Sequence, residues 1–221
     1  MHKTIEPAIH YWGTPVVLIS TLNEDGSSNL APMSSAWWIG WSCMLGLDAS
    51  SQTSINLMRE RECVLNLASA DLVPAVNRLA LLTGAADVPK HKRFLGYQHE
   101  ANKFAVAGLT PEASLDVKPP RAKECLVQLE ARVEDIKSFG SKDSRMAIPT
   151  IAVELRIVKT HVDESILQAP DSHRIDTEAW SPLLMTFRKL YGNPQHLAES
   201  RLANGPEEFY APWKFANPKI A

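Results

Sequence analysis

Alternation of apolar and polar residues over two long segments constrains the fold of this chain more than any other feature. In residues 123–136 an apolar residue occupies every second position from Cys125 to Val133, and from residue 128 onward charged or amide residues alternate with them. Residues 151–157 repeat the pattern. A period of two is typical of strands that bury one face. With the polar residues 137–149 as a loop, the two segments predict one long β-hairpin.

Shorter apolar and partly β-branched runs predict four further strands at residues 16–21, 30–38, 42–47 and 63–67. The turn residues at 23–26 lie between the first two runs, and Asp-Gly in such a place is a strong hairpin signal. A parallel sheet would show strands alternating regularly with long helices, and this sequence does not show that pattern. We therefore expect a mainly β protein with helices, built around an antiparallel barrel.

The first predicted helix begins near Gln52. Ser50 or Ser51 can cap it, because a side-chain oxygen at this position accepts a hydrogen bond from a free backbone N–H. Helical spacing then predicts that Ile55 and Met58 face the core.

Two more helices are expected further along the chain. Residues 71–82 have Asp71 as a possible cap and Gly84 as a stop signal. Residues 178–190 carry an apolar stripe with Pro182 in the first turn, where proline is tolerated.

Composition sets the class of protein. The chain has 221 residues, 45% hydrophobic and 22% charged, with a formal net charge of -2. These values are typical of a globular protein, and they give no reason to expect nucleic acid or a membrane as partner. We expect a single domain over residues 1–221, with residues 163–221 as a helical and extended C-terminal appendage. Its end, residues 204–221, is expected to wrap a partner subunit or the barrel.

The three cysteines indicate a reducing compartment. Cys43, Cys63 and Cys125 lie far apart in apolar stretches, without the spacing of a zinc site. An odd number of such cysteines fits reduced, buried thiols. The N-terminal residues do not read as a secretory signal, and the expected location is cytoplasmic.

Residues 48–54 are almost entirely hydroxyl, amide and carboxyl side chains at the start of the first predicted helix. A helix N-terminus offers free N–H groups and partial positive charge, so hydroxyls beside it can form a phosphate site. The alternative is that Ser and Thr gather here only because a turn needs them. Spacing alone favours the turn.

Several common motifs are absent from the sequence. There is no G-x-G-x-x-G, Walker A loop, G-x-S-x-G or HExxH. A nicotinamide dinucleotide, if used, would therefore not bind through a Rossmann unit. The basic stretch 88–103 reads either as a solvated face or as a segment that meets a dinucleotide's phosphates.

An ordered set of short blocks between Tyr11 and Ile157 resembles the FMN-binding split-barrel proteins of the flavin reductase-like family. The blocks are residues 13–21, 25–26, 29–35, 53–56, 62–67, 103–104, 107–111, 119–121, 124–125 and 129–130. The resemblance implies a six-stranded antiparallel Greek-key split barrel with peripheral helices, and FMN as the cofactor.

The resemblance also implies which residues contact FMN. Asn29 and Pro32 would shape the strand, and Met33, Ser34 and Ser35 would flank the isoalloxazine and the ribityl chain. The pyrimidine edge and the phosphate would be held by Asp48, Ser50, Ser51 and Thr53, and Asn56 would support that loop.

Gln52, Trp37 and Trp38 also bear on this assignment. The family often has a basic residue where this chain has Gln52, so the phosphate would be met by N–H groups, hydroxyls or arginines such as Arg59. Trp37 and Trp38 point to opposite sides of a strand, so only one can face the flavin ring.

The function implied is an NAD(P)H-dependent flavin reductase, with NADH or NADPH as hydride donor. No side chain need act as acid or base, and no metal is expected. The same resemblance implies a homodimer with flavin at the subunit interface, and a monooxygenase or other redox partner. Two alternatives stay open: an FMN electron carrier of the flavoredoxin type, and a split barrel that binds another ligand such as haem.

Overall fold

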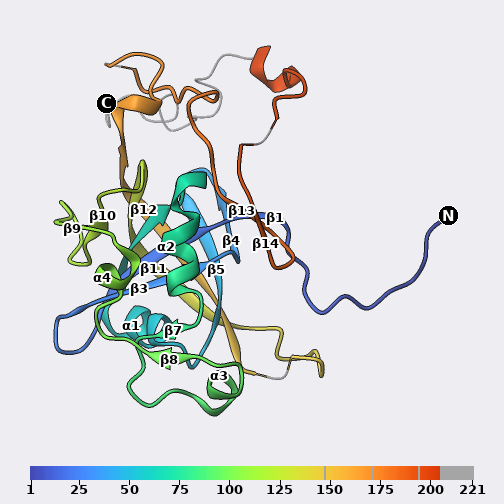
Figure 1. Ribbon diagram of the computed structural model, residues 1–221, viewed down its shortest axis with the longest axis vertical. Helices are drawn as coiled ribbons and strands as arrows, with labels where there is room; N and C mark the ends of the chain where they lie inside the picture. The colour runs from blue at the N-terminus through green and yellow to red at the C-terminus, as the bar shows by residue number, and fades with distance from the viewer. Residues whose placement is uncertain (147, 171, 194, 205–221) are drawn as a thin grey trace.

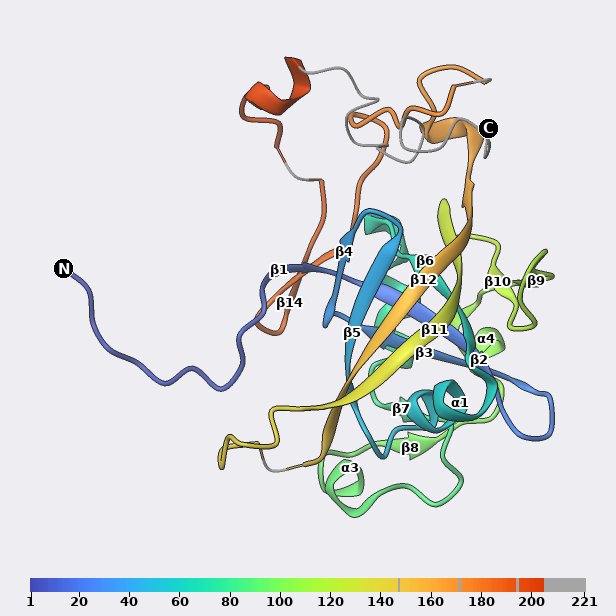
Figure 2. The same ribbon diagram turned by 180° about the vertical axis from the view of Figure 1, so that it is seen from behind.

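The computed structural model describes residues 1–146, 148–170, 172–193 and 195–204. Its centre is a seven-stranded antiparallel sheet in the order β3-β2-β6-β11-β12-β5-β4, shown in Figures 1 and 2. The strands are β2 (Val17–Leu22), β3 (Ser28–Met33), β4 (Ala36–Ile39), β5 (Ser42–Asp48), β6 (Glu62–Leu67), β11 (Val127–Phe139) and β12 (Thr150–Val162). The mainly β antiparallel class predicted from the sequence is confirmed.

The predicted strand at residues 30–38 is divided at Ser34 and Ser35, which explains seven strands instead of six. β3 ends before this pair and β4 begins after it, yet the two strands occupy opposite edges of the sheet. The Gly46 N–H donates to the Ser35 carbonyl at 2.8 Å and fixes the bend beside β5. The bend therefore brings the two edges of the sheet together, as a barrel requires.

Alternation along β2 creates two hydrophobic clusters. Val17 and Ile19 belong to the barrel interior, together with apolar residues of β5, β6, β11 and β12. Leu18 and Val16, the residue just before β2, point the other way and pack with apolar residues of α2 (Val73–Leu79) and α4 (Lys103–Ala107). Both faces of β2 are thus buried, and the two helices cover the outer face beside β3.

The long hairpin predicted from the alternating segments is present. β11 and β12 pair antiparallel from Val127 with Val162 to Phe139 with Thr150. The turn at residues 23–26 joins β2 to β3, and Gly26 has a φ of +80° there, which favours glycine. Cys43, Cys63 and Cys125 are buried free thiols, as expected.

The helix α1 (Gln52–Glu60) begins where predicted, with Ser51 as its cap, but it is turned relative to the prediction. Ile55 and Met58 are 42% and 46% exposed. The helix instead buries Thr53, Ser54 and Asn56 together with Leu57. Hydrogen-bond partners beneath α1 satisfy that polar face. The prediction from apolar spacing that Ile55 and Met58 face the core is therefore wrong.

The second helix is shorter than predicted. A 3-10 turn, η1 (Ala70–Leu72), leads into α2, which ends at Leu79. Leu82 belongs to a short strand, β7 (Leu82–Thr83), which pairs parallel to β8 (Gln98–His99). The residues predicted to form the last turn of the helix therefore lie in or next to a strand.

The helix predicted over residues 178–190 is wrong. The structure has two strands there, β13 (Leu184–Thr186) and β14 (Lys189–Tyr191), which form a three-stranded sheet with β1 (Trp12–Pro15). Leu183 is 1% exposed, and its backbone exchanges hydrogen bonds with Val16 and Ala68. Pairing with distant backbone therefore overrides the local helical pattern.

The remaining elements are short. They are α3 (Lys90–Phe94), β9 (Pro111–Glu112), β10 (Arg121–Ala122), η2 (Glu164–Ile166) and η3 (Arg201–Asn204). No helix within the described part of the chain is long and apolar enough to cross a membrane. The predicted wrapping tail falls almost entirely on residues 205–221, outside the described residues.

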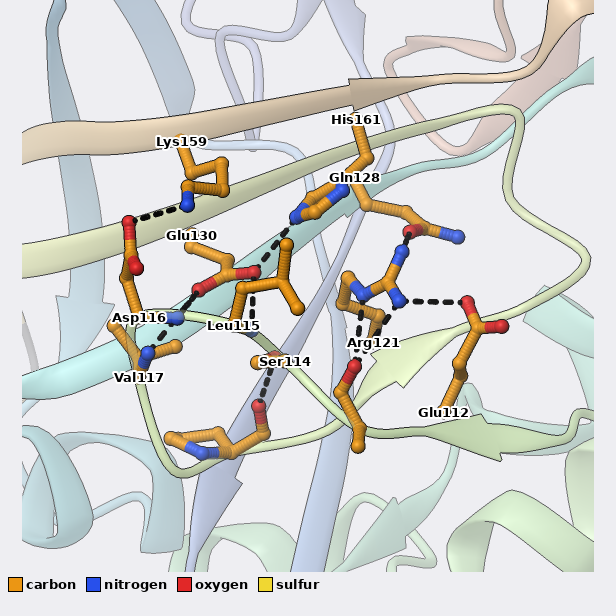
Figure 3. A network of polar contacts seen from close by, with 12 residues as sticks. Glu112, Ser114, Leu115, Asp116, Val117, Arg121, Gln128, Glu130, Lys159 and His161 are labelled. Carbon is orange, nitrogen blue, oxygen red and sulfur yellow. Dashed lines mark hydrogen bonds and ion pairs between the residues drawn. The ribbon is translucent and has the colours of Figure 1, made fainter.

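A buried carboxylate holds the loop before β10 against β11, as Figure 3 shows. Glu130 is fully buried and accepts hydrogen bonds from the backbone N–H groups of Leu115, Asp116 and Val117 at 2.6–3.1 Å. The His161 ring nitrogen lies 2.7 Å from the same carboxylate. Burial raises the pKa of Glu130, but these hydrogen bonds outweigh it and the pKa falls below its usual 4.5.

Replacing this carboxylate with its amide, Glu130→Gln, should lower the free energy of unfolding by on the order of 3 kcal/mol, since backbone donors lose a charged acceptor. Urea unfolding at pH 7 measures the loss. Because the folded-state pKa is lowered, the carboxylate's contribution is present above pH 4.5 and is lost as the pH falls through the folded-state pKa. The gap between wild type and variant should therefore narrow in acid.

Glu134→Gln, on the same strand, is the matched control. Glu134 is 46% exposed in its ion pair with Arg156, and such surface pairs contribute little. Equal losses in the two variants would contradict a special role for Glu130.

Candidate functional site

The loop that leads into α1 is held by its own side chains. The Ser51 hydroxyl accepts from the Ser54 N–H at 3.1 Å, and the Ser54 hydroxyl donates to the Asp48 carbonyl at 2.7 Å. Ser50 donates to the Asp48 carboxylate through both its N–H and its hydroxyl, at 2.8 and 2.7 Å. The hydroxyl-rich sequence therefore builds a rigid loop at the helix N-terminus.

A buried polar network joins α1 to β2 and β3. The Asn29 amide donates to the Thr21 and Thr53 hydroxyls, each at 3.2 Å. The Asn56 amide donates to the Thr21 hydroxyl and to the Asn23 side chain, each at 3.0 Å. These bonds place α1 against the end of β2 and the start of β3.

Between α1, β3 and the segment after α2 lies a pocket of about 90 Å³. Four predicted site residues line it: Pro32, Met33, Ser51 and Thr53. Its other lining residues are Ala31, Gln52, Leu79, Ala80, Leu82, Thr83, Gly84, Lys92, Tyr97 and Lys103. The pocket thus combines apolar walls, hydroxyls and two ammonium groups.

The other predicted site residues do not line this pocket. Asn29 and Asn56 belong to the buried network behind it. Ser35 bonds the Tyr11 hydroxyl at 2.7 Å, and Ser34, beside the bend, is 6% exposed. Asp48 and Ser50 lie in the loop at the edge of the pocket.

Lys103 is the most unusual side chain in the pocket. It is 3% exposed, and no described residue forms a hydrogen bond or ion pair with its ammonium. Burial, with the charge of Lys92, lowers its pKa from 10.5 to about 8, and nearby Glu100 opposes this shift only partly. A buried cation without an acceptor is costly, so the side chain is set to receive an anion.

The second cation is tied to the pocket's rim. Lys92 lies 3.2 Å from the Asp48 carboxylate, and the His91 ring nitrogen lies 2.9 Å from it. Partial burial raises the pKa of Asp48, but hydrogen bonds from Ser50 and His91 and the charge of Lys92 lower it overall. The helix α3 is therefore anchored to the loop before α1.

Close packing also shapes the wall beside Asn29. The Asn29 side-chain oxygen is buried and has no hydrogen-bond partner among the described residues. A Cβ added to Gly84 would lie 2.5 Å from that oxygen. Glycine at this position is required by the close approach of the two segments.

The sequence alone did not identify the two cations that line this pocket. Arg59, proposed to meet phosphate, instead donates to the Leu22 carbonyl at 2.6 Å and pairs with Glu60. In the sequence, Lys103 is noted only as part of a block that resembles the family, and Lys92 only as one residue of a basic stretch. Their convergence depends on the parallel pairing of β7 with β8, which no local pattern reveals.

The tryptophans of β4 alternate as expected. Trp37 is 56% exposed, whereas Trp38 packs against the barrel core.

Residues 9–193 match the model of the flavin reductase like domain. The chain belongs to the flavin reductase-like family. Its sequence is 40% identical over 190 residues to the uncharacterized protein YdfE of Bacillus subtilis, covering 86% of this chain and 88% of that protein.

Solved structures share the fold. Flavoredoxin of Desulfovibrio vulgaris superimposes with a TM-score of 0.74 and 20% identity, over 93% of this chain and all of that one. Nitrilotriacetate monooxygenase component B from Bacillus cereus gives 0.67 and 20%, over 87% and 89%. A flavin reductase with a split barrel domain from Shewanella frigidimarina gives 0.65 and 19%, over 85% and 86%. The split-barrel architecture is therefore established.

The chemistry of the lining residues suits a flavin that carries a phosphate. A phosphate monoester needs cations and hydroxyl or N–H donors, which Lys103, Ser51 and Thr53 supply. An isoalloxazine needs apolar surface, which Met33 and Pro32 offer beside the pocket.

The unpaired ammonium predicts a stability effect. In the flavin-free protein at pH 7, Lys103→Met should raise the free energy of unfolding by roughly 3 kcal/mol, from the pKa change between 10.5 and about 8. Because the folded-state pKa is lowered, the destabilisation is complete below pH 8 and disappears as the pH rises towards 10.5. Urea unfolding at pH 7 and pH 9.5 measures the difference.

Lys123→Met, at an exposed lysine, provides the control. A Lys103→Met protein no more stable than this control at pH 7 would show that the buried ammonium is well compensated.

Proposed function

We propose that this protein is an FMN-dependent flavin reductase that takes its hydride from NADH or NADPH. The observation that carries the proposal is the buried, unpaired ammonium of Lys103 beside the hydroxyls of Ser51 and Thr53. Together with membership of the family, it points to a flavin that carries a phosphate.

Each part of the pocket has a role in this proposal. Lys103, Ser51 and Thr53 bind the phosphate, while Met33 and Pro32 pack against the ring system. Asn29 and Asn56 position the loop and the strand from behind. The bound flavin would supply the redox chemistry by accepting a hydride from the nicotinamide.

The proposed hydride transfer needs no acid or base from the protein. The described lining residues of the pocket include no carboxylate and no histidine. Hydride transfer to a flavin requires orientation and exclusion of water more than proton transfer by the protein. The chain's contribution is therefore to bind and orient two flat ligands.

A second candidate is an FMN electron carrier that does not itself oxidise nicotinamides. The structural similarity to a flavoredoxin favours it. Both candidates use the same pocket, and only the response to nicotinamide separates them.

We also propose that the protein is a homodimer and that it passes reducing equivalents to a separate partner, such as a monooxygenase. Trp37 and Ile39 of β4 are 56% and 72% exposed, and Trp41 beside them is 48% exposed. An exposed apolar group of this size is typical of a subunit interface. Light scattering of the flavin-loaded protein would give its mass directly.

Lys103→Met should weaken FMN binding about 10- to 100-fold, because a hydrogen bond to a charged group contributes roughly 1.5–3 kcal/mol. Since the pKa of Lys103 in the flavin-free protein is about 8, wild-type affinity for FMN should fall as the pH rises through 8. The variant should lose this pH dependence. Fluorescence titration between pH 6.5 and 9.5 measures both effects.

Riboflavin, which lacks the phosphate, is the matched ligand control. Its affinity should be similar in wild type and variant. Replacing Ser51 and Thr53 with alanine should also weaken FMN binding, and unchanged affinity would remove them from the phosphate site.

The reaction itself is tested by mixing FMN-loaded protein with NADH, and separately with NADPH, in the absence of oxygen. Rapid loss of the visible flavin absorbance with either donor is expected. A bound flavin that stays oxidised would favour the electron carrier, and a protein that never binds flavin would refute the proposal.

A further inference from the structure

The helix α3 presents two different faces. Its inner side chains, His91 and Lys92, hold the Asp48 carboxylate, and Lys92 also lines the pocket. Lys92 lies 5.9 Å from the centre of the Tyr97 ring, which lines the pocket too. The helix is thereby fixed at the pocket's edge, and Figure 1 shows it beside β8.

The outer face of α3 has no structural task. Lys90 is exposed and forms no ion pair or hydrogen bond with a described residue. Arg93 has only a long contact of 3.8 Å with Asp87, and both side chains are exposed. Phe94 is 91% exposed.

Spacing places these three side chains together. Residues three and four apart in a helix lie on the same side, so Lys90 is a neighbour of both Arg93 and Phe94. The combination is one aromatic ring flanked by two cations. Phe94 and the neighbouring Leu95, which is 61% exposed, form an apolar surface, and the adjacent cations favour an anionic ligand on it.

We propose that this outer face binds the adenosine 2′-phosphate end of NADPH. The Phe94 ring stacks on the adenine, as aromatic side chains do with bases. Arg93 and Lys90 bind the 2′-phosphate, with the guanidinium suited to a phosphate by its paired donors. NADPH is then the preferred hydride donor. The inference rests on the proposed reductase function, whose donor it specifies.

The placement favours a dinucleotide over an unrelated anion. A nicotinamide that reaches the flavin brings its adenosine end away from the ring, towards the edge of the site. The helix α3 stands at that edge through its contacts with Asp48 and the pocket. NADH lacks the 2′-phosphate and would leave Lys90 and Arg93 without that ligand group.

The first experiment measures binding without any reaction. Calorimetric titration of the FMN-loaded protein with 2′,5′-ADP and with 5′-AMP should show at least tenfold tighter binding of 2′,5′-ADP. Replacing Lys90 and Arg93 together with alanine should abolish this difference. Phe94→Ala should weaken both ligands alike, because stacking does not sense the phosphate.

The matched control removes two positive charges elsewhere. Lys118 and Lys123, both exposed, lie in the segment between β9 and β11. Replacing them with alanine should leave the difference between the two ligands unchanged. Equal loss in this control would attribute the effect to overall charge and would overturn the site.

Kinetics then separates the two proposals. The ratio of kcat/KM for NADPH to that for NADH should be at least ten in wild type and should fall towards one in the Lys90 and Arg93 double variant. Reduction by NADH as fast as by NADPH, with no preference for 2′,5′-ADP, would refute this inference while leaving the reductase function intact. Absence of reduction by either donor would refute the reductase function, whereas selective binding of 2′,5′-ADP would still support the site on α3.

Discussion

The hydrogen bonds of Asn29 and Asn56 with Thr21 are the interaction on which the site depends. They join β2, β3 and α1 inside the protein, where unpaired polar groups would be costly. The same bonds explain why α1 turns its polar face inward. The loop that carries Ser50 and Ser51 is therefore fixed before any ligand binds, and ligand binding need not order it.

Two positive charges lie next to this hydrogen-bond network, one deep in the pocket and one at its rim. Lys103 sits deep in the pocket without an acceptor, while Lys92 at the rim is neutralised by Asp48. The deep cation favours a ligand that brings a phosphate into the pocket. The rim pair fastens α3 in place, and the outer face of that helix is left for a second ligand.

Much of the fold could be predicted from local pattern, because period-two alternation and turn residues act over a few positions. The β11–β12 hairpin, the turn at Gly26 and the Ser51 cap are examples. Prediction failed where distant partners decide the outcome. The polar face of α1 is buried because β2 and β3 offer partners, and residues 184–191 form strands because β1 offers a backbone edge.

The candidate site divides in the same way. Pro32, Met33, Ser51 and Thr53 line one pocket, and Asn56 lies in the polar network behind it. That these residues contact FMN stays a prediction. Lys103 and Lys92 come from segments far along the chain, and their meeting depends on tertiary structure. Arg59, closer in sequence, is occupied by the Leu22 carbonyl and Glu60.

The buried ammonium of Lys103, which has no acceptor, links the supply of cofactor to the amount of folded protein. A ligand that binds only the native state stabilises it by mass action, and here it also relieves a charge that the fold leaves unmatched. Newly made chains in a flavin-poor cell would spend more time unfolded and meet proteases more often. Abundance of this protein should then follow the flavin supply of the cell, without any dedicated regulator.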